Sequence, residues 1–165
     1  MLEDFITEKC GVFGIFGDSS SAEYTYLGLH NLQHRGQEHC GIVSASSRRL
    51  HKFHGRGIVN DVFNSDNLKR LKGSSAIGHV RYKTQGDSSL ENAQPLVRNN
   101  VAIAHNGEFA NQRRVKRRLS KDGCLFTTTT DTEIVLHQLA RSNTEGIEDR
   151  IYTAFSGLNP SYSIV

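Results

Sequence analysis

The chain has 165 residues, a formal net charge of +3 at pH 7 and a hydrophobic fraction of 36%. This length suits one domain with a hydrophobic core. No segment approaches the ~18 apolar residues of a membrane span, and so small a charge does not by itself indicate a nucleic-acid partner. Its three cysteines, Cys10, Cys40 and Cys124, form no CxxC pair, which argues against a disulfide scaffold or zinc cluster and favours the reducing cytoplasm.

The first half of the chain is predicted to mix short strands and helices. Residues 1–9 carry three acidic residues and no apolar segment, so they are neither a secretory signal nor a transit peptide. The elements expected after them are a strand over 12–16, a helix over 22–32, a hairpin of 41–46 and 49–54 with its turn at 47–48, helical turns over 59–63 and 66–71, and a strand over 75–82.

The second half is predicted to be mainly helical. A strand over 101–105 precedes a helix that Asn111 caps and that runs to about Lys121. Thr130 and Glu133 form a capping box for a helix that ends near Arg141. An amphipathic helix covers 147–158, and 162–165 begins a further strand. A final segment of this kind is typical of a truncated sequence, and we expect a domain that is incomplete at its C-terminus.

Cys10 opens the glycine-containing run 10–17, directly after the nine-residue leader. If the leader were removed, this residue would carry both a nucleophilic sulfur and a free α-amine able to act as its base. The alternative is a small, buried apolar side chain, which is what most free cysteines are. Position alone leaves both interpretations open.

Two further groups of residues favour structural interpretations. Residues 113–121 hold six positive charges and could bind phosphate, but Val115 and Leu119 are spaced as the buried side of a surface helix, and no aromatic residues interleave for base stacking. His30, His34 and His39 lack a carboxylate companion at metal-ligand spacing, so we expect no metal site.

Four short motifs follow Cys10 in order: LHNLQHRGQE at 29–38, IGHVRYKT at 77–84, AIAHNGE at 102–108 and TTTDTE at 128–133. With these motifs the chain, from Cys10 to about Tyr162, resembles the class II glutamine amidotransferases, whose nucleophile is an N-terminal cysteine. The run QHRGQ is most similar to the branch formed by the glutaminase half of amidophosphoribosyltransferases. The resemblance implies Cys10 as the catalytic nucleophile.

The other motif residues fit the groups of a glutamine substrate. Arg81 offers a planar fork for the α-carboxylate. Asp131, which the Thr130 cap leaves available, suits the α-ammonium, and the resemblance adds Thr84 to the glutamine-binding residues. Taken singly, Arg81 could be an ordinary arginine at a strand end and Asp131 a plain helix cap.

Asn106 and Gly107 follow the predicted strand over 101–105. Together they can aim a side-chain amide and a backbone N–H at one point, which is the arrangement of an oxyanion hole. Without the other motifs, Asn-Gly more often forms a hairpin turn.

The resemblance also implies the fold and the reaction. The fold would be of the α+β class, a four-layer αββα sandwich of N-terminal-nucleophile hydrolases over 10–165, with 1–9 as a propeptide-like leader. Loss of the leader frees the amine of Cys10, the sulfur attacks the glutamine amide, ammonia leaves and water hydrolyses the thioester. In the family, ammonia passes to a phosphoribosyltransferase domain that uses phosphoribosyl pyrophosphate and magnesium in the first step of purine synthesis. That domain is not in this sequence.

The glutaminase half itself needs no cofactor. The expected partners are glutamine, a phosphoribosyltransferase domain or chain and further copies in a homo-oligomer, with no membrane. Two alternatives remain: a non-catalytic remnant or binding subunit of such an enzyme, and a nucleic-acid binder that uses residues 113–121.

Overall fold

The computed structural model describes residues 10–47, 49–82 and 89–165, so the expected leader, Arg48 and Thr84 lie outside the described residues. In the described part, no helix is long and apolar enough to cross a membrane. The elements in chain order are β1 (Gly11–Phe16), α1 (Ser21–Asn31), the 3-10 helix η1 (Gln33–Arg35), β2 (His39–Ser46), β3 (Arg49–Arg56), α2 (Val59–Val62), α3 (Ser65–Leu68), β4 (Ser75–Arg81), the 3-10 helix η2 (Leu90–Asn92), β5 (Leu96–Arg98), β6 (Val101–Ile103), β7 (His105–Phe109), α4 (Gln112–Lys121), α5 (Thr132–Arg141), α6 (Ile147–Phe155) and β8 (Pro160–Ile164).

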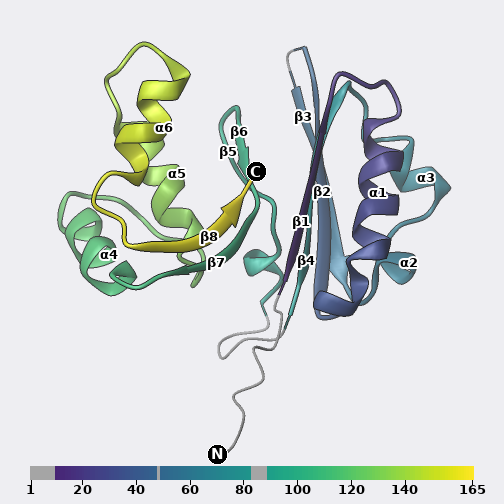
Figure 1. Cartoon of the computed structure of the whole chain (residues 1–165), viewed down its shortest axis with the longest axis horizontal. Helices are drawn as coiled ribbons and strands as arrows, with labels where there is room; N and C mark the ends of the chain where they lie inside the picture. Colours follow the sequence, from purple (N-terminus) through teal and green to yellow (C-terminus); the bar gives the residue numbers. More distant parts are fainter. Residues whose placement is uncertain (1–9, 48, 83–88) are drawn as a thin grey trace, which may run out of the picture.

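The larger sheet has four antiparallel strands in the order β1-β4-β2-β3. Helices α1, α2 and α3 cover one of its faces (Figure 1). Gly78 on β4 permits the close approach of α1, because a Cβ there would lie 2.6 Å from the Thr25 methyl carbon. The buried apolar cluster of this half contains Ala22, Leu29, Cys40, Ile42, Val59, Phe63, Leu71, Ala76 and Val80.

The second half is built on the antiparallel pair β7–β8, with the pair β5–β6 just before it in the chain. Helices α4, α5 and α6 lie on the side of the β7–β8 pair that faces away from the larger sheet (Figure 1). Phe109, at the end of β7, is fully buried and meets the rings of Phe155 and Tyr162 edge-on. The buried apolar cluster of this half contains Leu96, Ile103, Phe109, Val115, Leu119, Ile134, Val135, Leu136, Leu139, Ala154 and Leu158.

The α+β class and most of the predicted elements are confirmed. The basic helix is the amphipathic surface helix that was expected, because Val115 and Leu119 are its buried residues. The amphipathic helix near the C-terminus is α6, but Ile147 and Ile151 are 55% and 46% exposed. The predicted apolar face is therefore buried only toward its end, at Ala154 and at Leu158, which lies beyond the last residue of α6. Strand β5 was not predicted, since its three residues give no periodic signal.

Two local predictions are wrong. The strand expected over 101–105 divides: β6 ends at Ile103 and β7 begins at His105. Asn106 and Gly107 therefore lie inside a strand whose partner, β8, comes some fifty residues later, rather than in a segment that follows a strand.

The capping box is absent as well. The N-cap residue of α5 is Asp131, without a capping side-chain hydrogen bond, while the Thr130 hydroxyl contacts that of Thr128. The Glu133 carboxylate does not reach back to a cap, because it accepts hydrogen bonds from Thr127 and Thr128 instead.

Candidate active site

Cys10 lies directly before β1, and η1 holds its backbone on both sides. Its N–H donates to the Arg35 carbonyl at 3.0 Å, and its own carbonyl accepts from Arg35 Nε at 2.6 Å. The φ angle of Cys10 is 57°, in the left-handed region that residues other than glycine rarely adopt. Such a conformation persists only where the surroundings impose it, and it is common at functional sites.

The Cys10 thiol is partly buried at the end of β4. The Tyr82 N–H lies 3.5 Å from Sγ. Burial raises the pKa of the thiol above its usual value, although the Tyr82 N–H and the charges of Arg81 and Arg35 oppose this rise. The thiol is therefore protonated at neutral pH, and its use as a nucleophile requires a base within the site.

Arg81, the last residue of β4, is held in one orientation. Its Nε donates to Glu38 Oε2 at 3.1 Å, and its Nη1 donates to the Asn92 carbonyl at 3.1 Å. The backbone is close-packed here as well, because a Cβ on Gly36 would lie 2.5 Å from the Arg81 carbonyl carbon. Glu38 lies within the first sequence motif, but nothing in the pattern indicated this ion pair.

Strand β7 brings Asn106 to Cys10. The Asn106 Nδ2 lies 3.5 Å from the Cys10 carbonyl oxygen. The next residue, Gly107, has a φ of 145°, which favours glycine. The structure thus gathers three of the predicted residues, Cys10, Arg81 and Asn106, at the meeting point of β1, β4 and β7.

Asp131 contacts both ends of β7. Its Oδ2 accepts the Phe109 N–H at 3.0 Å, and its Oδ1 lies 3.4 Å from His105 Nδ1. The side chain is 12% exposed. The N-cap position belongs to Asp131, so the expectation that Thr130 caps the helix is wrong. The Asp131 carboxylate also has structural partners already. An ionised carboxylate has about four acceptor positions, so a further donor can still be accommodated.

A buried polar cluster fixes β7 from the other side. Gln94 Oε1 accepts the His105 N–H at 2.7 Å, and its Nε2 donates to the His105 carbonyl at 3.3 Å. His79 Nε2 lies 3.1 Å from the same carbonyl, so this nitrogen carries the proton. Burial lowers the pKa of His79 to about 3, against the effect of this hydrogen bond, and the imidazole is neutral. No sequence motif indicated a role for Gln94.

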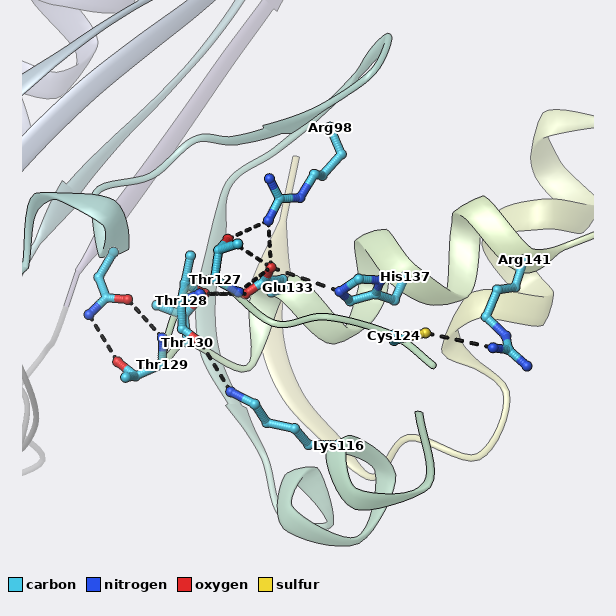
Figure 2. A network of polar contacts seen from close by, with 11 residues as sticks. Arg98, Lys116, Cys124, Thr127, Thr128, Thr129, Thr130, Glu133, His137 and Arg141 are labelled. Carbon is cyan, nitrogen blue, oxygen red and sulfur yellow. Dashed lines mark hydrogen bonds and ion pairs between the residues drawn. The ribbon is translucent and has the colours of Figure 1, made fainter. Parts of the chain in front are cut away.

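Glu133 organises the threonine segment 127–130, as Figure 2 shows. Its fully buried carboxylate accepts the backbone N–H groups and the hydroxyls of Thr127 and Thr128 and pairs with Arg98 Nη2 at 2.6 Å. Burial alone would raise the pKa of Glu133, but the two N–H groups, Arg98 and the Thr128 hydroxyl lower it to about 2. The carboxylate is therefore ionised at neutral pH.

Asn92 connects this segment to Arg81. Its side-chain amide donates to Thr129 Oγ1 at 2.9 Å and accepts the Thr129 N–H at 3.0 Å. The sequence contained no motif around Asn92, and its partners are remote along the chain.

Comparison with known proteins identifies relatives of this chain. A family model described as "Glutamine amidotransferase domain" matches residues 79–158. The chain is 47% identical to "Amidophosphoribosyltransferase, chloroplastic" of Vigna aconitifolia, over 96% of this chain and 33% of that protein. It is 42% identical to "Amidophosphoribosyltransferase" of Bacillus subtilis, over 97% of this chain and 35% of that protein. It thus spans about a third of the length of these relatives.

Two solved structures also match this chain. One described as the structure of the allosteric regulatory enzyme of purine biosynthesis matches with a TM-score of 0.87 and 42% identity, over 93% of this chain and 34% of that chain. The glutamine phosphoribosylpyrophosphate amidotransferase from B. subtilis, complexed with ADP and GMP, matches over the same shares with a TM-score of 0.84 and 40% identity. This chain therefore belongs to the class II glutamine amidotransferases, as a glutamine amidotransferase domain homologous to part of the amidophosphoribosyltransferases.

Proposed function

We propose that this chain hydrolyses the side-chain amide of glutamine with Cys10 as its nucleophile, once residues 1–9 have been removed. The freed α-amine takes the thiol proton, and the sulfur bonds to the amide carbon. The Asn106 amide and the Gly107 N–H stabilise the oxyanion. The amine then gives its proton to the departing ammonia, and water hydrolyses the thioester to glutamate.

The observation that carries this proposal is the placement of Cys10 between a backbone donor and an amide donor. The Tyr82 N–H lies 3.5 Å from Sγ, and Asn106 Nδ2 lies 3.5 Å from the Cys10 carbonyl oxygen. Because burial keeps the thiol protonated, a local base is required. An α-amine, with an ordinary pKa near 7.7–8.0, suits this role. With the leader attached, the Cys10 nitrogen is an amide that donates to Arg35 and cannot take a proton.

The glutamine carboxylate and ammonium are assigned to Arg81 and Asp131, with Thr84 as a further binding residue. Arg81 supports this assignment because Glu38 and the Asn92 carbonyl fix the plane of its guanidinium before any substrate arrives. A fork held in place loses little conformational entropy on binding a carboxylate.

The wider context follows the relatives. We assign the fold to the four-layer αββα sandwich of N-terminal-nucleophile hydrolases. The ammonia would pass to a phosphoribosyltransferase domain or chain that acts on phosphoribosyl pyrophosphate with magnesium, since the B. subtilis structure is a glutamine phosphoribosylpyrophosphate amidotransferase and the other structure is an enzyme of purine biosynthesis. The glutaminase step needs no cofactor.

A glutaminase assay before and after leader removal tests the proposal. The full chain is purified with a protease site placed directly before Cys10, and the leader is cut from the folded protein. Glutamate release from L-glutamine is expected only after the cut. It is expected to be lost in Cys10→Ala and retained in the thiol control Cys124→Ala.

A contrary result would point to the non-catalytic alternative. If the cut protein keeps its circular dichroism spectrum but releases no glutamate, and a diazoketone analogue of glutamine does not label Cys10, the chain is not a glutaminase.

A further inference from the structure

We propose that Asn92 is a positioning residue for glutamine: it sets the distance between Arg81 and the segment that ends at Asp131. This inference rests on the proposed function, in which those two residues bind the carboxylate and the ammonium of the substrate.

Asn92 contacts the two sides with separate groups. It is the last residue of η2 and is 1% exposed. Its backbone carbonyl accepts Arg81 Nη1 at 3.1 Å, whereas its side-chain amide makes two hydrogen bonds to Thr129. Because the Thr129 N–H can only donate, the amide oxygen must face it, and this fixes the orientation of the amide.

The segment that Asn92 meets is fixed at several other points. Glu133 binds the N–H groups of Thr127 and Thr128, and Lys116 Nζ donates to the Thr128 carbonyl at 3.0 Å (Figure 2). Asp131, two residues after Thr129, is fixed by the Phe109 N–H. A shift of Asn92 would therefore move Arg81 relative to this segment rather than be absorbed by it.

The chemistry of the substrate makes this distance important. The carboxylate and the ammonium of an amino acid are attached to one carbon, so their two partners must be held at a fixed separation. Misplacing a binding group by about 1 Å can cost as much as 100-fold in rate. Asn92 bonds to Arg81 and to the segment that ends at Asp131, and so sets the separation of the two partners.

Loss of stability alone would not prove this role, since any buried amide that loses its partners is destabilising. The test therefore compares two reagents that alkylate the same thiol. A diazoketone analogue of glutamine carries the α-carboxylate and α-ammonium, whereas iodoacetamide carries neither. The rate constants for alkylation of Cys10 are measured by mass spectrometry on the full chain, after the leader is cut from the folded protein.

The variants separate the link from the rest of the site. Asn92→Leu keeps the backbone carbonyl that Arg81 contacts but removes both bonds to Thr129. Thr129→Val removes only the bond through Oγ1 and serves if the first variant does not fold. Asn60→Leu, at an exposed position on α2, is the matched control.

We expect Asn92→Leu to slow the analogue about 10-fold or more relative to iodoacetamide, as loss of one well-placed contact does. Thr129→Val should have a smaller effect in the same direction, and Asn60→Leu none. Two outcomes overturn the inference alone, provided that the wild type reacts with the analogue at saturable rates. In the first, Asn92→Leu slows both reagents equally. In the second, the ratio of the analogue rate constant to the iodoacetamide rate constant is unchanged in both variants. If the wild-type protein itself shows no saturable reaction with the analogue, the proposed function fails and the inference fails with it.

Discussion

Replacing Glu133 with glutamine should destabilise the whole domain. The groups that bind its two carboxylate oxygens all act as donors: the N–H groups and hydroxyls of Thr127 and Thr128, together with Arg98. In Glu133→Gln, one oxygen becomes an NH₂ group that faces donors whichever way the amide turns. Arg98 also loses its counter-charge.

The expected cost is about 3 kcal/mol. Only the carboxylate of this ion pair is buried, because the Arg98 side chain is 44% exposed, and a hydrogen bond to a charged group is worth about 1.5–3 kcal/mol. Independently, the fall of the Glu133 pKa from 4.5 to about 2 corresponds to about 3 kcal/mol of preferential stabilisation of the ionised form. For a chain of this size, such a loss lowers Tm by about 6–12 °C. Urea unfolding followed by circular dichroism measures the change, with Glu145→Gln at an exposed loop position as the control.

The pH dependence gives the sharper test. Because the pKa of Glu133 is lower in the folded state than in the unfolded state, its contribution is complete above about pH 5 and is lost as the pH falls toward 2. The variant has no such titration, so its deficit should shrink by about 1.4 kcal/mol between pH 7 and pH 3.5. A deficit below about 1 kcal/mol at pH 7, or one that does not change over this range, would refute the reasoning.

Two other predictions concern the surroundings of Cys10. Gly36→Ala should cost about 1–3 kcal/mol of stability, because its Cβ would lie 2.5 Å from the Arg81 carbonyl carbon. Gly146→Ala should cost far less in the same unfolding assay, since only side chains lie near that position, at 3.5 Å or beyond. Equal costs would contradict the prediction. In the uncut chain, the rate of Cys10 alkylation by iodoacetamide should keep increasing with pH and reach its midpoint above pH 9.0, since burial raises the pKa of the thiol and only the thiolate reacts. A midpoint below pH 9.0 in the rate–pH profile would show that the charges of Arg81 and Arg35 outweigh burial.

The sequence predicted the elements whose signals are local. The β2–β3 hairpin, helix α1 and the basic helix α4 follow from alternation, from helical spacing and from the buried pair Val115 and Leu119. It failed where the partner lies far along the chain. The division between β6 and β7 depends on pairing with β8, which places Asn106 opposite Ser163, and no pattern near Asn106 encodes this.

The candidate site shows the same division. The motifs located Cys10, Arg81 and Asn106, and the structure brings these three together. They did not reveal Glu38 or Asn92, because each acts through a partner about forty residues away. Thr130 and Glu133 matched the spacing of a capping box, yet the backbone N–H groups of the preceding threonines bind the carboxylate first. A local rule fails when donors farther along the chain bind the same side chain.

Three of the predicted site residues share one physical feature: each of them is held in part by a backbone group. Cys10 is fixed by the Arg35 carbonyl, Arg81 by the Asn92 carbonyl and Asp131 by the Phe109 N–H. Backbone groups are the same whatever the side chain, so neighbouring positions can change identity without moving the site, provided that the backbone path is kept. The site should therefore be most sensitive where the path itself is constrained. Gly36, pressed against the Arg81 backbone, is such a position.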